Sequence, residues 1–300
     1  MEPTGIITNI QRFCLHDGSG IRTTVFFQGC PLRCRWCSNP ETQPASPVLL
    51  YDGSKCLGCK SCVAVCPHNA IRFDEALKLD RSRCKGCGSC LGACPSGALH
   101  LSGYRATAGQ VADSILRDRS YYEESGGGAT FSGGEATMQP EFLHALAALL
   151  KKQGVGVALE TCGYCKEETF RELLALCDEV LFDIKHLDPD AHVSGTGVSG
   201  TLIRKNLAYA AAHANVVLRL PLIPGYNMDE RHYEACGALA CRLGIPRVEL
   251  LPFHRLGAAK YGHMGLAYAY AGTEPPDMAA AERAAETLRC STGSRVKVVK

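Results

Sequence analysis

Short apolar runs alternate with stretches of helical periodicity along most of this chain. The runs are typical of buried strands, and the longer stretches repeat apolar residues at the spacing of one helix face. The predicted strands are 23–27, 129–132, 156–160, 179–184, 215–220 and 247–251. The predicted helices are 111–117, 140–152, 167–177, 203–213, 229–243 and 276–288. This order predicts an α/β fold with a parallel sheet, and six βα units predict a partial (β/α)6 barrel because a closed barrel needs eight.

Polar residues follow the carboxyl ends of these predicted strands, where barrel enzymes place their active sites. They are Cys30, Gly133, Gly134, Glu135, Glu160, Thr161, Asp183, Lys185, Arg219 and His254. Because consecutive strand ends converge, the sequence predicts one site at this mouth. The apolar stripe of the predicted helix 140–152 is interpreted as core rather than as a site.

Cysteine is the unusual component of the composition. The chain has 18 cysteines in 300 residues, and eleven of them lie between Cys30 and Cys94. The first residues do not resemble a secretory signal, and no apolar run reaches the roughly 18 residues that span a membrane. We therefore expect a cytoplasmic protein whose cysteines bind metal rather than form disulfides. The formal charge of +2, from 32 basic and 30 acidic residues without clusters, predicts neither a nucleic acid nor a membrane partner.

Residues 52–103 repeat one cysteine motif and are predicted to be an insert, with 1–51 and 104–300 forming the barrel. Each copy has the Cys-x2-Cys-x2-Cys-x3-Cys-Pro spacing of bacterial ferredoxins, in which the fourth cysteine of each run binds the other [4Fe-4S] cluster. Zinc is the alternative, but its sites seldom use four cysteines so tightly spaced. The predicted ligands are Cys56, Cys59, Cys62 and Cys94 for one cluster, and Cys84, Cys87, Cys90 and Cys66 for the other.

A third cysteine motif, Cys30-x3-Cys34-x2-Cys37, directly follows the first predicted strand. Thiolates are soft ligands that suit iron–sulfur clusters, and three of them leave one iron of a cubane without a protein ligand. An open position of this kind can bind a substrate, whereas a closed zinc site needs a fourth ligand. The motif therefore predicts a catalytic cluster. Cys162 and Cys165 lack a thioredoxin context, and we expect them to be buried rather than redox-active.

The stretch 17–41, DGSGIRTTVFFQGCPLRCRWCSNPE, resembles the activating enzymes of glycyl-radical enzymes in the radical SAM superfamily. The aromatic residue before the last cysteine belongs to the superfamily signature, and Ser19 stands where most relatives carry proline. The resemblance extends over nearly the whole chain. It implies contacts with S-adenosylmethionine from a set of eleven residues. These are Trp36, Cys37, Ser38, Gly133, Gly134, Glu135, Asp183, Ile184, Lys185, Arg219 and His254.

The resemblance also implies roles for some of these residues. The Gly133-Gly134-Glu135 motif would receive the methionine amino group, and Lys185 would pair with the carboxylate. Glu160 and Thr161 match an Asp-Thr pair that helps some relatives to bind a monovalent cation, but the longer acid leaves cation binding open here.

The chemistry implied by the family is reductive cleavage of S-adenosylmethionine at the Cys30, Cys34 and Cys37 cluster. The resulting 5′-deoxyadenosyl radical takes a hydrogen atom from a glycine of a partner glycyl-radical enzyme, for which residues 17–22 are a possible contact at the mouth. Three [4Fe-4S] clusters are expected, two of them relaying electrons from reduced flavodoxin or ferredoxin. A radical SAM enzyme acting on a small molecule and a multi-cluster electron carrier are the alternatives.

Overall fold

The computed structural model describes residues 2–299, and its centre is a nine-stranded sheet in the order β13-β12-β11-β10-β9-β8-β2-β1-β7. Six neighbouring strands are parallel and are the six predicted ones, with bounds that differ by one or two residues. They are β2 (Arg22–Phe27), β8 (Gly128–Gly133), β9 (Gly156–Thr161), β10 (Glu179–Asp183), β11 (Val216–Leu222) and β12 (Arg247–Pro252).

Three strands of this sheet were not predicted. β1 (Thr4–Cys14) is antiparallel to both β2 and β7 (Tyr104–Thr107), and β13 (Arg295–Val298) is parallel to β12. They lie toward the two ends of the sheet and alternate buried with exposed residues, unlike the continuously buried runs of β8 and β11. The sheet therefore extends beyond its six predicted strands on both sides.

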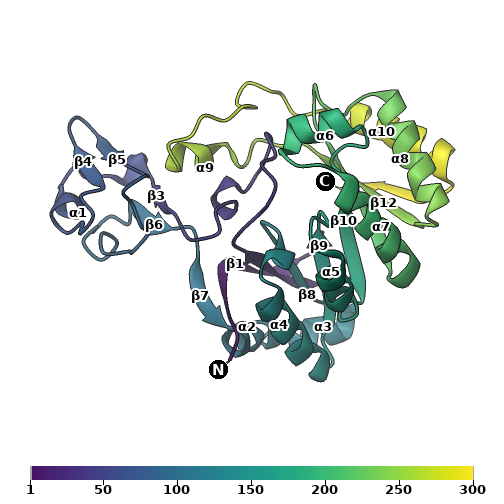
Figure 1. Cartoon of the computed structure of the whole chain (residues 1–300), viewed down its shortest axis with the longest axis horizontal. Helices are drawn as coiled ribbons and strands as arrows, with labels where there is room; N and C mark the ends of the chain where they lie inside the picture. The colour runs from purple at the N-terminus through teal and green to yellow at the C-terminus, as the bar shows by residue number, and fades with distance from the viewer. Residues whose placement is uncertain (1, 300) are drawn as a thin grey trace.

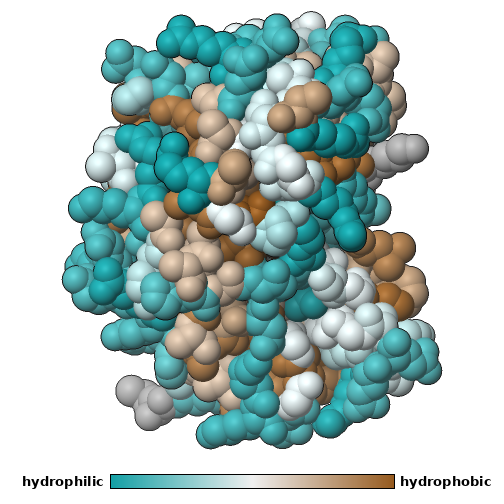
Figure 2. Space-filling model, turned by 90° about the vertical axis from the view of Figure 1, so that its right-hand side faces the viewer, coloured by the Kyte–Doolittle hydropathy of each residue, from teal (hydrophilic) through white to brown (hydrophobic). Residues whose placement is uncertain are grey.

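The helices pack their apolar faces against this sheet. Phe142, Leu146 and Leu150 of α4 are buried in one core cluster with Val25 and Phe131 of the strands. Figure 2 shows hydrophilic side chains over much of one outer face, with apolar atoms in patches between them. The helices that follow predicted segments are α2 (Ala108–Leu116), α4 (Pro140–Lys152), α5 (Glu167–Leu174), α7 (Thr201–His213), α8 (Glu230–Arg242) and α10 (Met278–Thr292).

Shorter helical segments join these units. They are α3 (Arg119–Ser125), α6 (Pro189–Thr196), α9 (Ala258–His263) and the 3-10 turns η1 (Pro40–Thr42), η2 (Gly53–Lys55) and η3 (Ala136–Met138). In Figure 1, α9 lies between the main sheet and a smaller lobe. Among the described residues, no helix is long and apolar enough to cross a membrane.

The smaller lobe contains the predicted insert (Figure 1). Its strands form two antiparallel pairs, β3 (Leu49–Tyr51) with β6 (Leu99–Leu101) and β4 (Ile71–Phe73) with β5 (Leu77–Leu79), beside the short helix α1 (Ser61–Ala64). Its buried residues form a separate small cluster of Leu49, Cys62, Ile71, Leu77, Cys90 and Leu99. Cysteines are thus part of the only core that this lobe has among the described residues.

Candidate functional site

Cys30, Cys34 and Cys37 lie together in the loop after β2. The N–H of Cys30 donates to the carbonyl of Gln43 (3.2 Å), and that of Cys37 donates to the carbonyl of Cys34 (3.1 Å). Burial, with a smaller contribution from neighbouring thiols, raises the pKa of Cys30 and of Cys34 to about 12. Three close thiols in a desolvated loop fit a soft metal centre that replaces their protons.

Gly133 and Gly134 allow the end of β8 to lie in close contact with the backbone that leads to Cys30. A Cβ atom on Gly133, whose φ is +110°, would lie 2.2 Å from the nitrogen of Phe27, and one on Gly134 would lie 2.3 Å from the carbonyl oxygen of Gly29. The N–H of Gly134 donates to Phe27 (2.9 Å). Only glycine allows this approach, so the motif fixes exposed backbone beside the cysteine loop.

The Glu135 side chain is 2% exposed and fully engaged by other protein groups. One carboxylate oxygen accepts hydrogen bonds from the hydroxyls of Thr137 and Thr161, both at 2.8 Å. The other accepts from the backbone N–H (2.8 Å) and the thiol (3.0 Å) of Cys162. Glu135 therefore ties the glycine turn to the end of β9. Thr137 and Cys162 were not predicted as its hydrogen-bond donors, although a buried glutamate in a glycine turn requires such donors.

Asp183 and Lys185 come from the end of β10 and lie near Cys34. Their side chains form an ion pair of 3.2 Å. Burial disfavours the charge of Lys185, but Asp183 and the thiol of Cys34 outweigh this effect and raise its pKa. The second carboxylate oxygen of Asp183, Oδ1, is buried without a hydrogen-bond partner among residues 2–299. A buried acceptor of this kind requires a donor from outside the chain, as a hydroxyl or amino group of a bound cofactor would supply.

Arg219 forms a second charged group beside the first, since it lies opposite Asp183 on the neighbouring strand β11. It is 3% exposed and makes ion pairs with Glu160 (2.7 Å) and Glu249 (3.0 Å). Burial would raise the pKa of Glu160, but Arg219 and a hydrogen bond from Ser132 lower it. The structure thus gives Glu160, Thr161 and Arg219 protein partners, Thr161 through its hydrogen bond to Glu135.

The remaining predicted residues occupy different environments. Trp36 is buried, with ring centroids 4.4 Å from Tyr226 and 6.3 Å from Tyr270. The side chain of Ile184 is 2% exposed and belongs to the hydrophobic core, so only its backbone can face a ligand. His254 lies beyond the end of β12 and is exposed.

The segment around α9 covers the cysteine loop, and sequence reasoning missed it. The hydroxyl of Tyr261 donates to the carbonyl of Cys37 (3.0 Å), and the ammonium of Lys260 donates to Asn39 and to Glu41, both at 2.6 Å. A Cβ atom on Gly257 would lie 2.6 Å from the carbonyl oxygen of Ser38. The aromatic residues at 261, 268 and 270 were the available signal.

The loop before β2 lies at the opposite end of the strands. Ser19 donates its N–H (2.8 Å) and hydroxyl (2.9 Å) to Glu179, the first residue of β10, so proline at this position could not make the first bond. The carbonyl of His16 accepts from Arg219 in the sheet interior. The expected position of residues 17–22 at the mouth is therefore wrong, because they lie where the strands begin.

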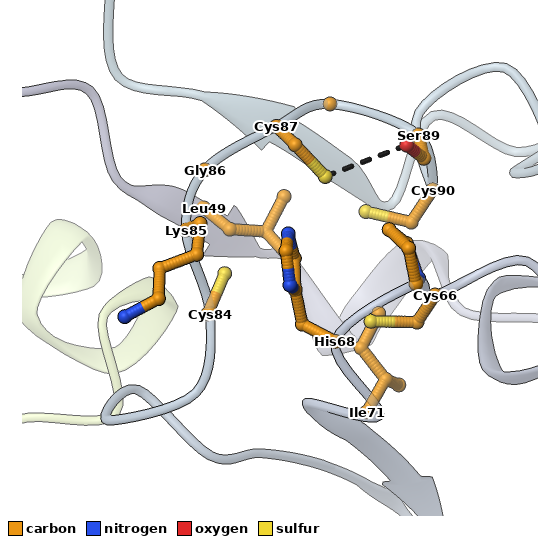
Figure 3. A pocket seen from close by; sticks show the side chains of 12 residues that line it. Leu49, Cys66, His68, Ile71, Cys84, Lys85, Gly86, Cys87, Ser89 and Cys90 are labelled. Atoms are coloured by element: carbon orange, nitrogen blue, oxygen red, sulfur yellow. Dashed lines mark hydrogen bonds between the residues drawn. The ribbon is translucent and has the colours of Figure 1, made fainter.

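Each predicted four-cysteine set of the insert lines its own cavity. Cys66, Cys84, Cys87 and Cys90 line the first, with about 310 Å³ of empty space, and Figure 3 shows their sulfur atoms turned toward a common space. Cys56, Cys59, Cys62 and Cys94 line the second, with about 330 Å³. The crossed grouping that brings each fourth cysteine to the other run is thus present. Within residues 2–299, no three His, Cys, Asp or Glu side chains are grouped closely enough to hold a single metal ion.

Comparison with known proteins identifies both parts of the chain. Residues 94–235 match the Radical SAM superfamily model, and residues 55–98 match the 4Fe-4S dicluster domain. The fold resembles that of Streptococcus suis SuiB bound to precursor peptide SuiA, with a TM-score of 0.55 and 11% identity over 90% of this chain and 46% of that chain. The architecture is therefore a radical SAM α/β fold with a ferredoxin-like domain. Its family membership implies a [4Fe-4S] cluster and S-adenosylmethionine, and the dicluster match adds at least one further cluster.

Curated relatives agree in more detail. The trans-4-hydroxy-L-proline dehydratase activating enzyme of Clostridioides difficile is 43% identical over 85% of this chain and 86% of its own. The choline trimethylamine-lyase activating enzyme of Oleidesulfovibrio alaskensis is 38% identical over 96% of each chain. Both names describe proteins that activate another enzyme. The chain therefore belongs to the glycyl-radical enzyme activating enzymes of the radical SAM superfamily.

Proposed function

We propose that this chain binds S-adenosylmethionine at a [4Fe-4S] cluster held by Cys30, Cys34 and Cys37 and activates a partner glycyl-radical enzyme. When bound and reduced, the cluster supplies the electron that cleaves the cofactor to methionine and a 5′-deoxyadenosyl radical, which takes hydrogen from a glycine of the partner. The chain's own residues hold the cofactor in place and exclude water.

The observation that carries this proposal is the unpartnered oxygen of Asp183 beside Lys185 and Cys34. A buried acceptor next to a buried ammonium fits a ligand that carries both a donor and a carboxylate. In the proposed complex, Lys185 pairs with the cofactor carboxylate and Asp183 accepts from one of its donors. Neither group needs to move far, because the ion pair already fixes both.

The glycine turn and the aromatic cover complete the proposed cofactor site. The backbone of Gly133 and Gly134 lies beside the cysteine loop and receives the amino group, while Glu135 keeps that backbone in place. Trp36 and the residues around Ser38 form the wall under α9. Ile184 lies in the core, Arg219 is paired with Glu160, and His254 is exposed in the segment after β12. In the proposed complex, Ile184 contributes through its backbone, Arg219 through the ion-pair network and His254 as a contact from that segment.

The finer architecture is also part of the proposal. We interpret the six parallel strands as a partial (β/α)6 barrel formed by residues 1–51 and 104–300, with 52–103 as the insert. The four-cysteine cavities support two [4Fe-4S] clusters there, which makes three in the chain. Reduced flavodoxin or ferredoxin is the proposed electron donor.

The partner is a glycyl-radical enzyme whose own substrate is not assigned. Relatives of similar identity are named for a hydroxyproline dehydratase and a choline lyase, so similarity alone does not choose between them. Similarity over nearly the whole chain to activating enzymes favours this function over a small-molecule radical SAM enzyme or an electron carrier.

The test is production of 5′-deoxyadenosine by the anaerobically reconstituted protein with dithionite and S-adenosylmethionine. We expect turnover in the wild type and none above background in Cys34→Ala, with Cys241→Ala as the control because Cys241 is exposed on α8. Turnover by Cys34→Ala would contradict the cluster assignment. After mixing with a candidate partner, a glycine radical detected by electron paramagnetic resonance would identify that partner.

A further inference from the structure

The β3–β6 ribbon of the insert has an inner end and an outer end. Leu49 pairs with Leu101 at one end and Tyr51 pairs with Leu99 at the other. The chain enters at Leu49 and leaves at Leu101, so that end is the one joined to the main sheet. The Leu49 end is therefore the inner end.

Hydrogen bonds clamp this inner end to the strand that carries the cysteine loop. The N–H of Ser102 donates to the carbonyl of Val48 (2.9 Å), and the N–H of Val48 donates to the hydroxyl of Ser102 (3.0 Å). The same hydroxyl donates to the Gln28 side chain (3.1 Å). Gln28 lies two residues before Cys30, so the inner end is fixed close to the beginning of the catalytic loop.

The two cavities of the insert lie at different ends of the ribbon. The cavity of Cys66, Cys84, Cys87 and Cys90, here called the inner cavity, is lined by Leu49. The cavity of Cys56, Cys59, Cys62 and Cys94, here called the outer cavity, is lined by Tyr51 and Leu99. A Cβ atom on Gly86, in the inner cavity, would lie 2.6 Å from the carbonyl oxygen of Pro47 in the incoming linker.

A second route of contacts joins the inner cavity to the catalytic loop through α9. Arg81, three residues before Cys84, donates to the carbonyls of Leu49 (3.0 Å) and of His263 at the end of α9 (3.4 Å). From the same helix, Tyr261 donates to the carbonyl of Cys37 (3.0 Å). Arg81, near Cys84 of the inner cavity, is therefore connected to Cys37 of the catalytic loop through two hydrogen bonds and the backbone of α9 between them.

The outer cavity is bordered by a large exposed apolar side chain that the inner cavity lacks. Leu57, which lines it, is 71% exposed, and Lys60 in its lining and the nearby Lys55 are also exposed. An exposed apolar side chain close in sequence to two exposed lysines, of which Lys55 also pairs with Asp52 (3.4 Å), suits contact with an acidic electron-carrier protein.

We propose that the inner cavity holds the cluster that passes electrons to the catalytic cluster, and that the outer cavity holds the cluster where electrons enter. This order rests on the proposed function, which places one [4Fe-4S] cluster in each cavity. An acidic, low-potential one-electron carrier protein reduces the outer cluster. One electron then passes to the inner cluster and from it to the catalytic cluster, each donor returning to its oxidised state, and no covalent bond forms or breaks in the relay.

Cys59→Ala and Cys87→Ala form a matched pair that tests this order. The two residues occupy the same position in the two repeats, and both are exposed. The measurement is the microwave power saturation of the catalytic-cluster signal in the fully reduced protein, with that signal identified by its change on adding S-adenosylmethionine. Magnetic interaction between clusters falls steeply with distance. We therefore expect severalfold easier saturation in Cys87→Ala and little change in Cys59→Ala, and the reverse result would overturn the order.

A second test uses variants that keep every cysteine, because the cysteine variants can lose their fold. Lys85 lines the inner cavity and Lys60 the outer one. Removing a positive charge lowers the potential of the adjacent cluster, because the reduced cluster carries the more negative charge. In a potentiometric titration, reduction of the inner cluster is detected as the potential at which the catalytic-cluster signal becomes harder to saturate. This potential should be lower in Lys85→Gln than in the wild type, and it should be unchanged in Lys60→Gln. Movement in Lys60→Gln alone would overturn the order.

Iron content separates failure of the order from failure of the proposed function. Wild-type protein with about twelve irons per chain, as three [4Fe-4S] clusters require, together with the reversed saturation result, would refute only the order. About four irons per chain after full reconstitution would refute the clusters of the insert, and the order would fall with them.

Discussion

The catalytic loop and the insert are each proposed to hold a cluster, and they enclose their cysteines in different ways. Burial raises the pKa of Cys30 and Cys34 to about 12. Hydrogen bonds from Ser61 and Ser89, in contrast, lower the pKa of the fully exposed thiols Cys59 and Cys87. The catalytic loop is enclosed by residues distant in sequence, whereas each cavity of the insert is lined by three cysteines of one run and the fourth cysteine of the other.

The difference extends to what stabilises each region. The main sheet has two large apolar clusters, but the small core of the insert includes the potential ligands Cys62 and Cys90. We infer that the main sheet keeps its fold without iron and that the insert does not. Substitutions far from Cys30, Cys34 and Cys37 in the sequence should therefore affect the catalytic site, whereas loss of iron should affect the fold of the insert.

Removing the iron tests this contrast most strongly and should have the largest effect. We expect amide hydrogen exchange in 52–103 to accelerate by at least about 100-fold in the iron-free protein, because cluster binding is part of the folding free energy of a small metal-binding lobe. Strands β8 to β11 should keep their protection. Equal loss of protection in both regions would show that the main sheet also depends on iron.

The second prediction concerns Lys185, the buried cation of the catalytic site. Lys185→Met should weaken binding of S-adenosylmethionine by about 10- to 100-fold, since a hydrogen bond to a charged group contributes about 1.5–3 kcal/mol. Cofactor titration of the reconstituted protein measures the effect. The insert should keep its iron, because Lys185 belongs to a different lobe.

The control for this variant removes both charges. Lys185→Met alone leaves Asp183 buried without its partner, which lowers stability. The double variant D183N/K185M should recover thermal stability without recovering cofactor binding. Recovery of both would mean that Lys185 acts only as a structural partner of Asp183.

The same contrast determines how much the sequence could predict. The repeats of the insert are local and have the spacing of bacterial ferredoxins, in which the fourth cysteine of each run binds the other cluster. The crossed grouping of Cys66 with Cys84, Cys87 and Cys90 could therefore be expected, and the structure places these residues around one cavity. The six parallel strands were also predictable, since they are short runs rich in apolar and β-branched residues. Strand β7 was not, because its four residues are mostly exposed.

The enclosure of the catalytic site was less predictable, because it depends on contacts between distant residues. The aromatic Tyr261 is a local signal in α9, a helix of six residues that include a glycine, but it does not indicate that Lys260 and Tyr261 reach the cysteine loop some 220 residues earlier. The Glu135 motif was visible, but its donor Cys162 lies 27 residues away. His254 is exposed and Ile184 is buried because of the way in which other segments pack over the strand ends. A short sequence motif does not specify that packing.

Cys162 provides the third prediction. Cys162→Ala removes the thiol donor to Glu135 and leaves a small cavity, so we expect a loss of about 1 kcal/mol in unfolding free energy and a severalfold increase in KM for S-adenosylmethionine. Cys162→Ser, which keeps a donor, should restore KM. Cys236→Ala is the matched control, since Cys236 is buried in the core away from the site and should lower stability without changing KM. An unchanged KM in Cys162→Ala would mean that Glu135 does not need this donor.

The smallest effect is expected at α9, which contacts both regions: Arg81 of the insert donates to the carbonyl of His263, and Tyr261 donates to the carbonyl of Cys37. Tyr261→Phe keeps the ring and removes one hydrogen bond, so unfolding free energy should fall by about 1 kcal/mol. The g values of the catalytic cluster should shift while those of the insert clusters stay constant. In the control Tyr268→Phe, the lost bond to Trp36 is longer, 3.4 Å, and a smaller change should follow. Tyr261 contacts the catalytic loop through the carbonyl of Cys37. A shift confined to the g values of the insert clusters would therefore show that α9 positions the insert rather than the loop.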